Sequence, residues 1–106
     1  MVFYSQQALL DLEDVRFGLL YWKKIELNYT FILSYIEDIF DICNSLDKKM
    51  HHFDTTFPSH KKYGQKVHRY RRNPNTTWYI IYDIDRDNNI CINKIISNYL
   101  TIGEQE

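Results

Sequence analysis

Two hydrophobic periods follow one another along this chain, and their order limits the folds that it can adopt. The first half contains two stripes with steps of three and four residues, the spacing of amphipathic helices. The stripes are Ala8, Leu12, Val15, Leu19 and Trp22, and then Ile32, Ile36, Ile39, Cys43 and Leu46. The second half contains three short β-prone runs at residues 66–72, 76–84 and 89–96, separated by turn-forming residues. This order predicts a helical hairpin followed by an antiparallel meander.

A short strand is predicted before the first helix. Val2, Phe3 and Tyr4 are β-prone, and Ser5 is a favourable N-cap. We therefore expect a single two-layer α+β domain over residues 1–106, with the order strand, helix, helix and three strands. The N-terminal strand and the helical hairpin should pack on one face of a small antiparallel sheet, because both layers have one apolar face to bury. The other face of the sheet should be left free.

The charges of the chain are segregated. Residues 55–82, called here the basic segment, contain six Lys/Arg residues and no carboxylate, although the formal net charge of the whole chain is −1. The six are Lys61, Lys62, Lys66, Arg69, Arg71 and Arg72. A strip of one sign indicates a site for an anion, either a phosphate backbone or an acidic protein segment. The alternative is a solvated loop and edge strand whose lysines oppose aggregation.

The direction of the arginine side chains follows from strand alternation. Arg69 and Arg71 alternate with His68, Tyr70 and Arg72 along the first strand of the meander. If Tyr70 packs under the helices, Arg69 and Arg71 point outward. The aperiodic, basic loop that precedes this strand, residues 51–65, is long for so small a domain, which favours a functional role.

Several classes of site are disfavoured. The apolar runs are shorter than the roughly 18 residues that cross a bilayer, so we expect a cytoplasmic protein with no membrane partner. Cys43 and Cys91 lie within apolar patterns and are expected to be reduced packing residues. The segment "DIDRDNN" at residues 83–89 lacks the glycine and the glutamate of an EF-hand, and we expect no metal and no cofactor.

Nearly the whole chain resembles the toxins of the RelE/ParE superfamily from type II toxin-antitoxin systems, and two stretches mark the start and the end of the resemblance. They are "VFYSQQALLDLEDV" at residues 2–15 and "YGQKVHRYRRNPNTTWYIIYDIDRDNNICINKII" at residues 63–96. The resemblance implies a RelE-like domain that a cognate antitoxin wraps and neutralises. RelE-like members cleave ribosome-bound mRNA with the 2′-hydroxyl as nucleophile, whereas ParE-like members poison DNA gyrase. A degenerate toxin that binds only its antitoxin is a third interpretation.

The resemblance also suggests site residues. Arg71 is similar to the arginine that RelE-like enzymes place against the scissile phosphate, and Lys61 or Lys62 occupies the place of their loop lysines. RelE-like enzymes usually supply an arginine, histidine or tyrosine after the last strand. This chain departs from that pattern: it lacks the arginine, and of Ser97, Asn98 and Tyr99 only Tyr99 could take part. Candidate catalytic residues are Arg71, Arg69, Tyr99 and His68, and candidate RNA-binding or target-binding residues are Lys61, Lys62, Lys66, Arg72 and Tyr79.

Surplus apolar residues on the predicted helices suggest where the antitoxin binds. Each helix has apolar side chains beyond one stripe, and exposed apolar area commonly marks a partner site. These residues are Leu9, Phe17, Leu20 and Phe40. The alternative is a wide core-facing stripe.

Overall fold

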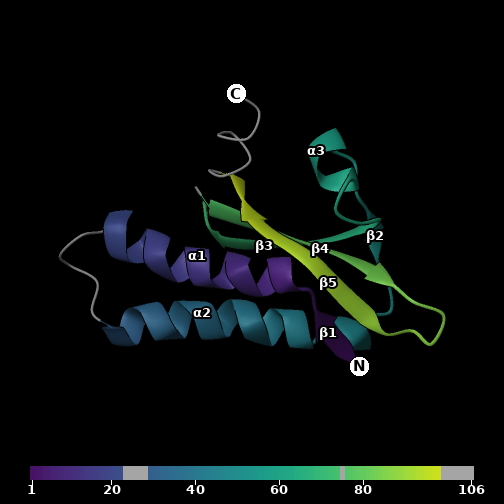
Figure 1. The fold of residues 1–106 in the computed structure, drawn as a ribbon, viewed down its shortest axis with the longest axis horizontal. Coiled ribbons are helices and arrows are strands. Elements are labelled where there is room, and N and C mark those ends of the chain that lie inside the picture. Colours follow the sequence, from purple (N-terminus) through teal and green to yellow (C-terminus); the bar gives the residue numbers. More distant parts are fainter. Residues whose placement is uncertain (23–28, 75, 99–106) are drawn as a thin grey trace.

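The computed structural model describes residues 1–22, 29–74 and 76–98 and places two long helices against one side of a five-stranded sheet (Figure 1). The predicted α+β class is therefore confirmed. In chain order the elements are β1 (Val2–Tyr4), α1 (Gln6–Trp22), α2 (Tyr29–Asn44), the 3-10 turn η1 (Leu46–Lys48), β2 (Phe53–Asp54), α3 (Pro58–Lys61), β3 (Lys66–Asn73), β4 (Thr76–Ile84) and β5 (Ile90–Ser97).

The sheet is mixed, whereas an antiparallel sheet was predicted. Its strand order is β1-β5-β4-β3-β2, and β3, β4 and β5 form the expected antiparallel meander. The correction concerns β1, which runs parallel to β5 with Val2 opposite Ile90 and Tyr4 opposite Ile92. The β-prone composition of residues 2–4 predicts a strand but does not specify its partner or direction.

The main core lies between the two long helices and one face of the sheet. The helical stripes supply residues such as Ala8 and Ile39, and the sheet supplies Trp78, Ile80 and Tyr82. These three β4 residues alternate along the strand and so point to the same face. The buried indole nitrogen of Trp78 donates a hydrogen bond of 2.8 Å to the Tyr35 hydroxyl of α2, which satisfies the polar atom. Cys43 packs in this core as a free thiol.

Polar contacts attach the beginning of α1 to β5. The hydroxyl of Ser5 caps the helix by accepting a hydrogen bond of 3.0 Å from the backbone N–H of Ala8. Because β1 ends at Tyr4, opposite Ile92, the backbone N–H of Ile95 further along β5 needs a hydrogen-bond acceptor from another element. Asp11 supplies it by accepting 2.9 Å from the backbone N–H of Ile95, and its other carboxylate oxygen lies 3.2 Å from the Lys94 ammonium.

The second face of the sheet is partly covered, and the expectation that it would be free is wrong. Val67, Ile81 and Ile96 form a smaller buried cluster there, with Tyr63 and Tyr79 packed against it. The loop predicted at residues 51–65 contains β2 and α3, and Figure 1 shows α3 on the side of the sheet opposite α1 and α2. Sequence periodicity did not detect these elements because they have only two and four residues.

Candidate nucleic-acid interface

Arg69 and Arg71 lie on the face of β3 that points away from the long helices. Tyr70 packs against the main core, and both arginines are exposed, as strand alternation predicts. Arg69 is directly opposite Tyr79 on β4, and Arg71 is opposite Thr77. Opposite residues in an antiparallel pair have Cβ atoms about 5 Å apart on the same side of the sheet. Two guanidinium groups and a tyrosine therefore share one exposed patch, which we call the arginine face.

The α3 segment borders the arginine face. Pro58 occupies the first turn of α3, where its fixed φ and missing N–H are tolerated. His60 is 1% exposed, and its ring centroid lies 4.8 Å from that of Tyr79. Phe57, the residue before the helix, lies 5.1 Å from His60 and 6.1 Å from Tyr79 between ring centroids. Lys61 and Lys62 follow at the end of α3, and both are exposed.

Hydrogen bonds hold residues 55–65, the segment that contains α3, on the sheet. The Thr55 hydroxyl donates 3.0 Å to the carbonyl of Gly64, and its backbone N–H donates 2.9 Å to the carbonyl of Gln65. Asp83 of β4 accepts 2.9 Å from the Gln65 N–H, and Asn93 of β5 donates 2.8 Å to a carbonyl of the same loop. The ends of the segment are therefore attached both to each other and to two strands.

Gly64 lies at the closest approach between the segment and the sheet. A Cβ atom at this position would lie 3.0 Å from the carbonyl oxygen of Tyr82 and 3.1 Å from a methyl carbon of Ile81. The first of these atoms belongs to the backbone of a central strand and cannot move independently. Glycine therefore permits the close packing of the segment.

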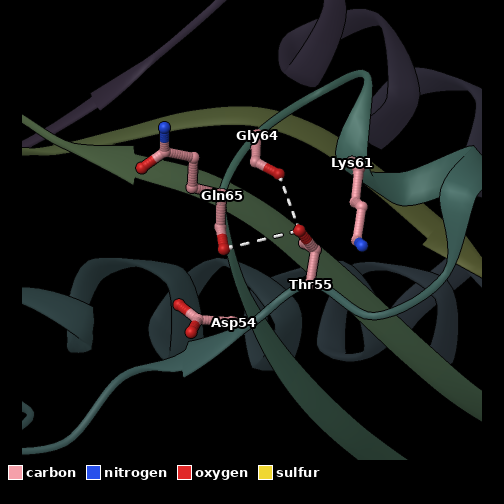
Figure 2. Close-up of a pocket in the computed structure, with 5 residues that line it drawn as sticks. All are labelled: Asp54, Thr55, Lys61, Gly64 and Gln65. Carbon is pink, nitrogen blue, oxygen red and sulfur yellow. Dashed lines mark hydrogen bonds between the residues drawn. The ribbon is translucent and has the colours of Figure 1, made fainter.

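A shallow hollow of about 330 Å³ lies beside this attachment, lined by Asp54, Thr55, Lys61, Gly64 and Gln65. Figure 2 shows that the Thr55 hydroxyl points toward the two carbonyl groups and that Lys61 extends from α3 near it. Asp54 is bound by the Lys66 ammonium at 2.6 Å, and this contact lowers the pKa of its carboxyl. The carboxylate that immediately precedes the basic segment is thus paired within the fold.

The other members of the basic segment lie elsewhere. Arg72 forms a short ion pair with Asp38 of α2, lies 4.2 Å over the Tyr35 ring and donates 3.1 Å to the Tyr70 hydroxyl. Lys66 is opposite Tyr82 on the helix side of the sheet. Their placement in intramolecular ion pairs does not support the predicted roles of Arg72 and Lys66 in target binding.

His68 also lies on the helix side of the sheet, opposite Ile80. The Lys49 ammonium donates a hydrogen bond of 2.9 Å to its Nδ1 atom. Burial and the adjacent Lys49 charge lower the pKa of His68, so the imidazole is neutral near pH 7. This environment separates His68 from Arg69 and Arg71, and its placement does not support the predicted catalytic role.

The predicted antitoxin-binding residues are only partly described. Leu9 on α1 is 48% exposed, and Phe40 on α2 is 37% exposed and stacks on Tyr4 with 5.0 Å between ring centroids. The side chains of Phe17 and Leu20 lie outside the described part of the chain, and so does Tyr99.

Sequence reasoning did not identify Phe57 and His60 as neighbours of the arginine face. Pro58 was a usable signal, because proline is favoured in the first turn of a helix, but the pairing of the segment with Tyr79 is a tertiary contact. Within residues 1–22, 29–74 and 76–98, no group of three His, Cys, Asp or Glu side chains is arranged to hold a metal ion. Across the same ranges, no helix has both the length and the apolar character to cross a bilayer.

Comparisons with known proteins found no match: no family model, no curated protein and no solved structure is significantly similar to the chain.

Proposed function

We propose that this chain is the toxin of a type II toxin-antitoxin pair and that it arrests growth by acting on ribosome-bound mRNA. The observation that supports this most directly is the arginine face. Arg69 and Arg71 are exposed side by side, and in the described part of the chain neither forms an ion pair with a carboxylate. Guanidinium groups bind phosphate through two parallel hydrogen bonds, so this face suits an RNA backbone.

The chemistry that these residues would supply is charge stabilisation. Attack of a 2′-hydroxyl on the adjacent phosphate creates a negatively charged, five-coordinate transition state, and donors already in position lower its energy. Arg71 would contact that phosphate, and Arg69 a neighbouring one. Proton transfer to and from the two ribose oxygens requires a further group. Tyr99 is our candidate for that role.

The order of elements agrees with the proposal. A strand, two helices and a three-stranded meander follow one another, and the helices cover one face of the sheet. We propose that this arrangement is the RelE-like topology, with β2 and α3 inserted before the meander. The cognate antitoxin would bind the helical hairpin, where Leu9 and Phe40 expose apolar area.

A second candidate, poisoning of DNA gyrase without chemistry, is favoured by the position of His68. The imidazole lies on the helix side of the sheet and is bound by Lys49, so it is not available for proton transfer at the arginine face. An exposed cationic patch without a histidine is sufficient to bind an acidic protein surface.

Induced expression tests the proposal. We expect growth arrest by the parent chain and its reversal by co-expression of the protein encoded next to it. Arg71→Ala should abolish arrest and Arg69→Ala should weaken it, because each change removes a guanidinium group that would bind phosphate. Both side chains are exposed, so their removal opens no core cavity and the fold should be retained. Arg86→Ala is the matched control, since it removes one exposed arginine from the β4–β5 turn.

Mapping of transcript ends by primer extension then separates the two targets. New 5′ ends within translated mRNA support cleavage, whereas intact transcripts together with accumulated gyrase-DNA complexes support the gyrase alternative. Normal growth despite abundant folded protein would contradict both and leave only antitoxin binding.

A further inference from the structure

An aromatic cluster shares Tyr79 with the arginine face and is only partly buried. It consists of Phe57, His60 and Tyr79, whose ring centroids are 4.8 to 6.1 Å apart. Phe57 is tilted by 80° to both of its neighbours. His60 is 1% exposed, but Phe57 is 40% exposed, so the cluster buries its histidine and leaves a phenylalanine ring partly in solvent.

Cationic residues lie on the elements that carry the cluster. Arg69 is opposite Tyr79 in the β3–β4 register, and the exposed Lys61 and Lys62 begin four residues after Phe57. The nearest carboxylates along the chain are occupied: Asp54 binds Lys66, and Asp83 accepts hydrogen bonds from Gln65 and Asn93. Asp54 is therefore neutralised by Lys66, whereas Asp83 keeps its charge because both of its donors are neutral.

Exposed aromatic rings within a cationic surface suit single-stranded nucleic acid. Each unpaired base can stack on a side-chain ring, while arginine and lysine neutralise the phosphates on either side. A ring that only packed against the smaller cluster of Val67, Ile81 and Ile96 would be more stable if buried, because each Å² of apolar surface left in water forgoes about 25 cal/mol of stabilising free energy.

We propose that the exposed ring of Phe57 stacks on one unpaired nucleobase of single-stranded RNA, with Tyr79 holding the Phe57 ring through an edge-to-face contact, and that Arg69 and Arg71 bind the phosphates next to it. This inference rests on the proposed action on RNA and specifies how the RNA is held. It makes α3 part of the RNA-binding surface, with His60 acting as the buried support that orients the Tyr79 ring. Binding should therefore depend on the presence of a base as well as on charge.

Direct binding measurements test the subsite. The probes are a fluorescein-labelled oligouridylate of about eight nucleotides, within the ~4–16-nucleotide range of single-strand sites, and an abasic ribose-phosphate strand of equal length. Their affinities are compared by fluorescence anisotropy over a series of salt concentrations. The parent protein should bind the oligouridylate roughly tenfold more tightly than the abasic strand, as expected for one stacked base.

Substitutions then separate stacking from charge. Phe57→Leu should remove the preference for the oligouridylate and leave affinity for the abasic strand unchanged, whereas Phe57→Trp should retain the preference. Arg71→Ala should weaken binding to both strands and reduce the salt slope by about one. Phe3→Leu is the matched control: Phe3 is 48% exposed on β1, at the opposite edge of the sheet from β3 and β2, and its replacement should change neither affinity.

Three results would overturn the inference: oligouridylate affinity that Phe57→Leu leaves unchanged, equal loss for both strands, or a parent protein that binds neither strand. Circular dichroism of each variant shows whether the fold is retained. If Phe57→Leu is unfolded, photocrosslinking of bromouridine-substituted RNA to the parent replaces it, and crosslinks outside residues 55–61 and 76–84 overturn the subsite. Retained RNA binding without base dependence refutes the subsite alone, whereas failure of growth arrest refutes the proposed function.

Discussion

Removing the carboxylate of Asp11 should destabilise this fold more than removing a neighbouring carboxylate from the same helix. Asp11 is 5% exposed and accepts three hydrogen bonds: 2.9 Å from the backbone N–H of Ile95, 3.2 Å from the Lys94 ammonium and 2.9 Å from the Gln7 amide. The Lys94 side chain is 13% exposed. The ion pair is therefore largely withdrawn from water and lies where β1 no longer covers the β5 edge.

The expected loss of unfolding free energy follows from the two groups that Asp11→Ala leaves without a partner. Asp11→Ala leaves the Ile95 N–H without its acceptor, which costs about 1–3 kcal/mol, and leaves a largely buried ammonium without a counter-charge. Breaking one partner of a buried ion pair typically costs about 3–5 kcal/mol in total, and the two contributions overlap. We expect a loss of about 3–5 kcal/mol, a large share of the roughly 5–15 kcal/mol by which such domains are stable.

Urea unfolding followed by circular dichroism measures the loss, with Asp14→Ala as the control. Asp14 is exposed on the same helix, so this variant makes the same change in helix propensity without the buried contacts and should lie within about 0.5 kcal/mol of the parent. Asp11→Asn keeps an oxygen for the Ile95 N–H and should lose about 2 kcal/mol. Adding Lys94→Met to Asp11→Ala should recover part of the loss, because no unpaired charge remains.

Hydrogen exchange supplies a local readout. The Ile95 amide should be protected in the parent and in Asp11→Asn but should exchange faster in Asp11→Ala, beyond the change in global stability. An Asp11→Ala loss no larger than that of Asp14→Ala, with an unchanged Ile95 exchange rate, would show that apolar packing alone attaches α1 to β5.

Three further perturbations have defined outcomes. Gly64→Ala should lower the free energy of unfolding by about 1–3 kcal/mol, because the new Cβ atom meets the Tyr82 carbonyl oxygen at 3.0 Å; denaturant unfolding measures this loss, and unchanged stability would contradict the close approach. Because burial and Lys49 lower the pKa of His68 in the folded state, the unfolded chain binds more protons as the pH falls through about 6.5, and stability should decrease toward pH 5. Urea midpoints measured between pH 7.5 and 5 should fall less steeply for His68→Asn, and parallel curves would refute the assignment. Arg72→Ala should cost about 1–2 kcal/mol through loss of the cation–π and ion-pair contacts with α2, while soluble protein at parental levels should still arrest growth; loss of arrest would return Arg72 to the target-binding surface.

Local sequence patterns were sufficient for much of the architecture. The stripes with steps of three and four predicted the two long helices, and the separated β-prone runs predicted the meander. Alternation along residues 66–72 placed Arg69 and Arg71 on the face opposite Tyr70, because successive side chains of a strand must point to opposite sides. The same rule put Arg72 and His68 on the helix side, although their partners Asp38 and Lys49 could not be read from it.

Contacts between distant segments were decided only by the tertiary structure. Residues 2–4 form a strand wherever they pair, and only the path of the chain through α1 and the meander makes β1 parallel to β5. The contact of Phe57 and His60 with Tyr79 depends on a loop that the Thr55 hydrogen bond closes. The same loop can approach the sheet closely because Gly64 has no Cβ atom. Periodicity encodes which way a side chain points within its own element, since backbone geometry repeats locally. It does not encode which element lies opposite, because that choice depends on packing and hydrogen bonds summed over the whole fold.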